Sequence, residues 1–224
     1  MKSQLRVIGC LWYIFAAVIA LPADGSKQTF YTHSGTSVIL SPELITRISK
    51  SLHARIDSLV FYDMDNAYPW LKNGKIFIVR NWDRHEDLQI FIGTKTQNII
   101  KDPESLSDVF SSNETLPKPL EIADLIAWAV IQSPSMVVQP LFLNGPCWEN
   151  AKIADRDGLE KELKKKLEFT INTDQSWRLE FNVIKSDGGC EHVSVSGELS
   201  PIVVTELHRT ILEKPGCFPW MAKG

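Results

Sequence analysis

The chain has 224 residues, of which 44% are hydrophobic and 23% are charged, a composition that excludes a largely disordered protein. Its 24 Lys and Arg residues against 27 Asp and Glu residues give a formal net charge of −3. This leaves no basic excess for binding a phosphate backbone or an anionic membrane surface, so we expect a folded protein that does not bind nucleic acid.

The first segment has the pattern of a secretory leader. Lys2 and Arg6 precede residues 7–21, which carry no charge, and small residues follow at 22–25. As a helix this run would reach about 22 Å, short of the roughly 30 Å hydrocarbon core of a bilayer. We expect residues 1–25 to be a signal peptide, with an uncleaved anchor as the alternative. Residues 26–224 would then be a soluble, secreted or periplasmic domain without a stable membrane span, starting with a mobile segment around 33–37.

Export would place Cys147, Cys190 and Cys217 in an oxidising compartment. An odd number of cysteines indicates one disulfide and one thiol, or three reduced thiols. Cys190 opens a predicted strand and Cys217 follows a predicted helix that runs back along it, which favours the pair Cys190–Cys217 over Cys147–Cys217. No cysteine or histidine pair has the spacing of metal ligands, so we expect neither a metal nor a cofactor.

The first half of the chain predicts a helix, three strands and a second helix. Ser41-Pro42 begins a helix whose apolar residues recur three and four apart. Residues 58–62 form a strand, and 75–80 and 88–94 form a hairpin around the charged tip 81–87. Asp102-Pro103 begins a short helix that ends near Phe110.

The second half predicts the same order of elements. Pro119 begins a hydrophobic helix to residue 132 that must be buried on more than one side, and the strand-like run 136–143 contains Pro140, which places it at a sheet edge. The remaining predicted elements are a helix at 155–167, strands at 167–172, 177–185 and 190–197, and a last helix that starts at Ser200-Pro201.

These elements together predict an α+β protein with antiparallel sheets and packed helices. The repeated order suggests two αβββα pseudo-repeats, 42–112 and 155–214, linked by the buried helix 119–132 within one domain. Convergence of unrelated elements is the alternative to a true duplication.

One motif has the residue types of an enzyme. The apolar strand at 58–62 ends in Asp63-Met64-Asp65, and this segment resembles the first motif of the haloacid dehalogenase-like phosphohydrolases. The resemblance implies Asp63 as the nucleophile, Asp65 as acid and base, and a magnesium ion. It departs from that family at Ala67, where the family carries Thr, and the predicted hairpin differs from the parallel sheet that the family needs. A divergent metal-dependent phosphohydrolase is therefore the alternative function, and an Asx turn at the strand end is the structural interpretation.

Exposed aromatic residues favour a binding function instead. The predicted loops hold Tyr68, Trp70, Trp148 and Trp220 beside Pro or Gly, where their rings could contact a sugar or a peptide. We therefore expect a non-catalytic binding or interaction module whose partner is an unknown protein, peptide or carbohydrate, with a purely structural subunit as a third alternative. Asn113-Glu114-Thr115 matches the acceptor pattern for N-glycosylation, which matters if the source is eukaryotic.

Overall fold

The structure is a computed structural model that describes residues 27–64, 67–131, 136–138, 146–149, 152–185 and 188–214. The predicted leader at residues 1–25 lies outside the described residues. Within them, no helix combines the length and apolar character needed to cross a membrane.

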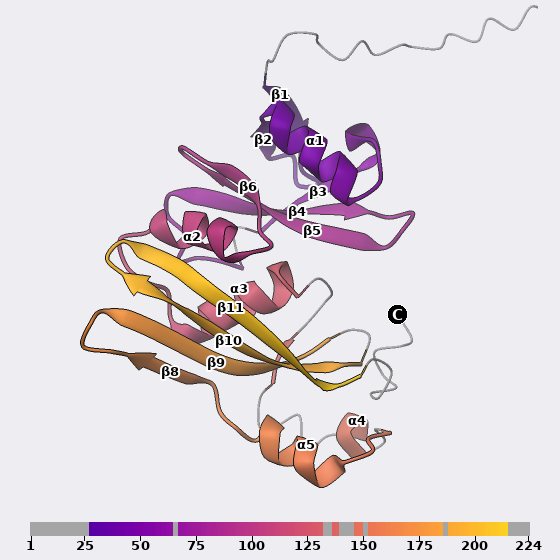
Figure 1. The fold of residues 1–224 in the computed structure, drawn as a ribbon. Helices are drawn as coiled ribbons and strands as arrows, with labels where there is room; N and C mark the ends of the chain where they lie inside the picture. The colour runs from indigo at the N-terminus through magenta and orange to yellow at the C-terminus, as the bar shows by residue number, and fades with distance from the viewer. Residues whose placement is uncertain are drawn as a thin grey trace, which may run out of the picture.

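The helices and sheets are stacked in layers (Figure 1). Helix α1 (Pro42–Ser51) covers one face of a four-stranded sheet, and its residues Leu44 and Ile48 pack there with Phe61 and Phe77. Helices α2 (Pro103–Ser111) and α3 (Pro119–Ala129) lie between this sheet and a five-stranded sheet. Helices α4 (Pro146–Glu149) and α5 (Arg156–Leu163) lie on the far side of the second sheet.

Within the described residues, every ladder between two named strands is antiparallel, which confirms the predicted α+β class with antiparallel sheets. The four-stranded sheet has the order β3-β4-β5-β6, and the second sheet has the order β11-β10-β9-β7 with β8 also paired to β9. The bounds in the first sheet are β3 (Val60–Asp63), β4 (Gly74–Asn81), β5 (Glu86–Gly93) and β6 (Gln97–Ile99), after the short 3₁₀ helix η1 (Ile56–Ser58). Those in the second are β7 (Met136–Val137), β8 (Glu168–Ile171), β9 (Ser176–Ile184), β10 (Cys190–Leu199) and β11 (Ile202–Glu213).

The capping residues act as the sequence predicts. The Ser41 hydroxyl accepts a hydrogen bond from the Leu44 amide at 3.2 Å, and the Asp102 carboxylate accepts one from the Ser105 amide at 2.9 Å. Each cap satisfies a backbone donor that the first turn of a helix leaves without an intrahelical acceptor. Helices α1 and α2 and the β4–β5 hairpin are thus confirmed close to their predicted bounds.

The largest hydrophobic cluster joins the two sheets. Ile76 and Phe91 from the first sheet, Leu125 and Ile126 from α3, and Trp177 from the second sheet belong to one cluster of buried residues. Because α3 contributes side chains to this shared cluster, its strongly apolar sequence is explained by burial between two sheets.

The predicted last helix is wrong: residues 202–213 form β11, which pairs antiparallel with β10. The β-branched residues Ile202, Val203, Val204 and Thr205 favour a strand, and the Ser-Pro step that resembled a helix start is instead the turn between the two strands. At Gly197 of β10 an added Cβ would lie 1.9 Å from the Val203 carbonyl oxygen, so this close approach of the two strands requires glycine.

The second predicted αβββα unit therefore loses its final helix. Helix α5 is followed by the four strands β8 to β11, each paired with the next, and α1 is likewise followed by the four strands β3 to β6. A second correction concerns the segment around 33–37, which is not a loose start of the domain. It forms the turn of the hairpin between β1 (Gln28–Tyr31) and β2 (Ser37–Leu40).

Cys190 is buried beside Ile184 and Trp148 in the cluster under α5. No disulfide is seen among the cysteines whose side chains the structure describes. Cys217 and the side chain of Cys147 lie outside the described residues, so the pairs Cys190–Cys217 and Cys147–Cys217 stay predictions.

Candidate functional site

The aromatic residues that the sequence suggests as ligand contacts are mostly packed into the protein. Tyr68 is 7% exposed and Trp148 is 4% exposed. Trp70 is half-buried and packs against Tyr68 and Phe110, with ring centroids 6.0 and 6.2 Å away. Trp220 lies outside the described residues. The structure thus brings Tyr68 and Trp70 together, but it leaves little of the Tyr68 and Trp148 rings for a ligand to cover.

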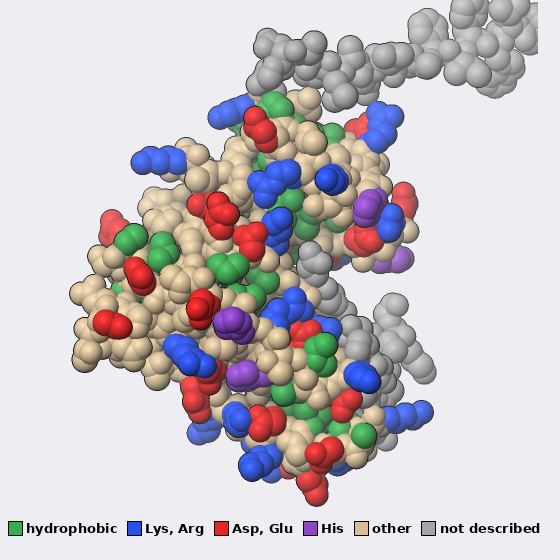
Figure 2. Space-filling model, in the orientation of Figure 1, with side chains coloured by type: hydrophobic (Ala, Val, Ile, Leu, Met, Phe, Trp, Pro, Cys, Tyr) green, Lys and Arg blue, Asp and Glu red, His purple; other side chains and the backbone are tan. Residues whose placement is uncertain are grey.

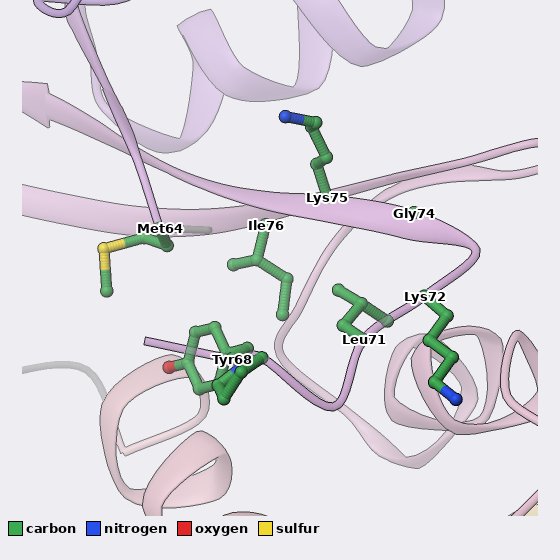
Figure 3. Close-up of a pocket in the computed structure, with 8 residues that line it drawn as sticks. Met64, Tyr68, Leu71, Lys72, Gly74, Lys75 and Ile76 are labelled. Carbon is green, nitrogen blue, oxygen red and sulfur yellow. The ribbon is translucent and has the colours of Figure 1, made fainter. Parts of the chain in front are cut away.

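Tyr68 also lines a pocket of about 240 Å³ beside the start of β4. In Figure 3 the apolar parts of Met64, Tyr68, Leu71 and Ile76 surround it, whereas the Lys75 side chain points to the other face of β4. The Lys72 side chain also extends away from the cavity. The pocket is smaller than the roughly 300 to 1,000 Å³ typical of drug-sized ligand sites. Its apolar walls can hold a small apolar group.

The polar group of Tyr68 is committed to the interior. Its hydroxyl lies 3.4 Å from the Gln89 side-chain oxygen, and Gln89 is 3% exposed. Burial raises the pKa of Tyr68 to about 12 and outweighs the hydrogen bond with Gln89, which by itself would lower the pKa. This hydroxyl is therefore a hydrogen-bond donor at neutral pH and not a base.

Asp63 lies at the end of β3, where it pairs in register with Phe77 of β4. The strands on both sides of β4 are antiparallel, in contrast to the parallel sheet that the resemblance to the phosphohydrolases implies. Asp65 lies outside the described residues, and among the described ones no group of three or more His, Cys, Asp or Glu residues could hold a metal ion.

A more exposed group of side chains lies at the tip of the β4–β5 hairpin. The Arg80 guanidinium carbon is 4.7 Å from the Trp82 ring centroid and 5.7 Å from that of Tyr62. The His33 ring lies 5.9 Å from Tyr62. Asp87 holds the guanidinium from the side through two hydrogen bonds, of which the one to Nε is 2.6 Å long. We call these five residues, His33, Tyr62, Arg80, Trp82 and Asp87, the Trp82 platform.

The sheet register explains why these residues meet. Arg80 is directly opposite Asp87 on β5 and Val60 on β3, so that Tyr62, two residues after Val60, lies on the same face. His33 is positioned through its backbone, because its amide donates to the Phe61 carbonyl at 2.8 Å. Trp82 is the first residue of the turn at 82–85 and is 50% exposed.

The electrostatics of the Trp82 platform are set by the Arg80 and Asp87 pair. Donating hydrogen bonds to the Asp87 carboxylate raises the pKa of the Arg80 guanidinium, so this group stays charged at every physiological pH. Two of its three nitrogens bind Asp87, whereas Nη1 makes no hydrogen bond to the described residues. The platform therefore offers an aromatic ring fixed by a cation, beside a donor that can bind an oxygen acceptor.

The sequence reasoning missed this group. It interpreted 81–87 as a solvated hairpin tip and did not include Tyr62 or Trp82 among the ligand contacts. The sequence does contain one signal for it. Arg80 and Asp87 are equally far from the centre of the turn, so they lie opposite each other in a hairpin with a four-residue turn.

The chain matches no protein-family model. Comparison of its sequence with the curated proteins and of its fold with the solved structures finds no significant similarity.

Proposed function

We propose that this chain is an exported, non-catalytic interaction module that binds a protein partner through the Trp82 platform. The observation that carries the proposal is the contact of the Arg80 guanidinium with the rings of both Trp82 and Tyr62, held by Asp87 at the end of a hairpin. Trp, Tyr and Arg are the residue types that most often dominate the binding energy of protein interfaces.

The chemistry of the platform defines what the partner presents. The exposed half of the Trp82 side chain suits an apolar or proline side chain, and Nη1 of Arg80 suits a backbone carbonyl or a carboxylate. Rings fixed in advance lose little conformational entropy on binding, which supports a preformed recognition surface. The Arg80–Asp87 pair has no net charge, and Figure 2 shows basic and acidic side chains interspersed over the visible face. Both features support a partner surface with little net charge and not a polyanion.

The test is site-specific photo-crosslinking. A photoreactive residue at Asp83, next to Trp82, is expected to capture a defined extracellular protein, whereas the same residue at Thr170 on the exposed strand β8 is not. Trp82→Ala, combined with the Asp83 probe, should reduce capture at least about tenfold, the loss expected for one interface hot spot. Its unfolding midpoint should stay close to that of the parent, because Trp82 is half exposed.

Equal capture from the two positions, or capture that survives Trp82→Ala, would contradict the proposal. A glycan array provides the competing outcome: saccharide binding that Trp82→Ala abolishes, without a protein crosslink, would identify a carbohydrate ligand in place of a protein.

A further inference from the structure

The acceptor pattern Asn113-Glu114-Thr115 lies in the turn that follows α2. The backbone N–H of Asn113 donates to the Phe110 carbonyl at 3.0 Å, and Glu114 and Thr115 are exposed. We propose that Asn113 is a site of N-linked glycosylation. The inference rests on the export component of the proposed function and is independent of the Trp82 platform.

The reaction forms a bond between Asn113 Nδ2 and the anomeric carbon of a saccharide carried on a polyprenyl diphosphate. The bond from that carbon to the diphosphate oxygen breaks, and the polyprenyl diphosphate leaves with the bonding electron pair. One of the two Nδ2 protons of the side-chain amide is released to solvent. The modified side chain keeps its carbonyl oxygen and one N–H group.

The described contacts of Asn113 are compatible with this product. Oδ1 accepts a hydrogen bond from the Lys72 amide at 3.2 Å, and Nδ2 donates to the Val109 carbonyl at 3.2 Å. One remaining N–H is sufficient for the Val109 bond, and the reaction leaves Oδ1 unchanged. The second Nδ2 contact, 3.4 Å from the Ser112 hydroxyl, is the longest and is the one that the glycan replaces. Because the folded protein already uses the side chain, we infer that transfer occurs before this turn folds.

The position also leaves the Trp82 platform uncovered. The Asn113 side chain is hydrogen-bonded to the Lys72 backbone, just before β4 begins at Gly74. Trp82, in contrast, follows the last residue of β4. The eight residues of β4 span about 25 Å, so glycan and platform lie at opposite ends of the strand.

The test expresses the full chain with its own leader in a eukaryotic secretory cell line. The secreted protein should lose the mass of one glycan on treatment with an amidase that releases N-linked glycans. Asn113→Gln and Thr115→Ala should both abolish this shift, and Thr115→Ser should retain it. Thr115→Ala is the decisive variant because it leaves the Asn113 side chain in place; a shift that persists in it overturns the proposal.

A second arm replaces residues 1–25 with a leader of known efficiency. A secreted chain without the glycan in this arm overturns the inference while leaving the proposed binding function intact. Glycosylation in this arm but none with the native leader means that the natural chain does not enter the secretory pathway. That outcome overturns both the inference and the export component of the proposed function.

Discussion

Glu191 of β10 is a buried charge, only 3% exposed, whose carboxylate is bound by two cations. The Arg209 Nε lies 2.7 Å from one carboxylate oxygen, and the Lys185 Nζ lies 3.1 Å from the other. Burial by itself would raise the pKa of Glu191, but the hydrogen bonds from Arg209 and Lys185 outweigh it, and the net effect is a lowered pKa. The group therefore stabilises the fold only when it is ionised.

This carboxylate should contribute to the acid sensitivity of the protein. A lowered pKa means that its contribution is present above the usual carboxyl pKa of about 4.3 and is lost as the pH falls through the lower, folded value. Glu191→Gln should lower the free energy of unfolding at pH 7 by about 2 kcal/mol, because Arg209 and Lys185 lose their charged acceptor. It should also flatten the fall in stability below pH 4.3, as measured by urea unfolding across pH. Glu198→Gln, at an exposed position, is the matched control. An unchanged pH dependence in Glu191→Gln would show that the ion pairs of Glu191 with Arg209 and Lys185 contribute nothing to the acid sensitivity.

Among the elements, α2 and β11 contribute to the same hydrophobic cluster and are also joined by a side-chain hydroxyl. Ser107 on α2 accepts a hydrogen bond from the Val204 amide at 2.8 Å, and its hydroxyl lies 2.8 Å from the Pro103 carbonyl as a donor. Val204 lies on the outer strand of its sheet, so Ser107 satisfies a backbone donor that has no neighbouring strand.

Removing that hydroxyl should loosen the contact between helix and strand. Ser107→Ala leaves the buried Val204 amide without an acceptor and is expected to cost about 1 to 2 kcal/mol in urea unfolding. Ser111→Ala is the control, because that hydroxyl is exposed and donates only to the Asp108 carbonyl of its own helix. Equal stability losses in the two variants would mean that the contact between α2 and β11 has no special role.

At this scale the sequence predicted elements with strong local signals and missed those that depend on distant partners. Ser41-Pro42 and Asp102-Pro103 begin helices because capping needs only neighbouring residues. Ser200-Pro201 has the same pattern but joins two strands, since the adjacent β10 stabilises 202–213 as a strand. The Trp82 platform was missed for a related reason: Tyr62 and Asp87 are brought to Arg80 only by the register of three strands.

For the whole molecule, the central helix α3 makes the two large sheets interdependent. Leu125 is fully buried in the cluster that also contains Phe91 from the first sheet and Val195 from the second. Leu125→Ala should therefore lower the free energy of unfolding by about 2 to 5 kcal/mol through the lost burial and the cavity left behind.

Hydrogen exchange can show whether Leu125→Ala destabilises both sheets. Amide protection in β4 and in β10 should fall together in Leu125→Ala, whereas the control Leu120→Ala, at a position 46% exposed, should change neither. Loss of protection in only one sheet would show that the two sheets unfold as separate units.

The connection between α2 and α3 passes through the exposed Glu114 and Thr115, between helices that both contribute to the shared core. A chain severed at this point would yield one piece carrying α1, the first sheet and α2, and another carrying α3 and the second sheet. Each piece would expose an apolar surface shaped to the other, which favours noncovalent reassembly. The layered order thus makes the protein a natural starting point for a split reporter, in which fusion of the two pieces to other proteins would signal their proximity.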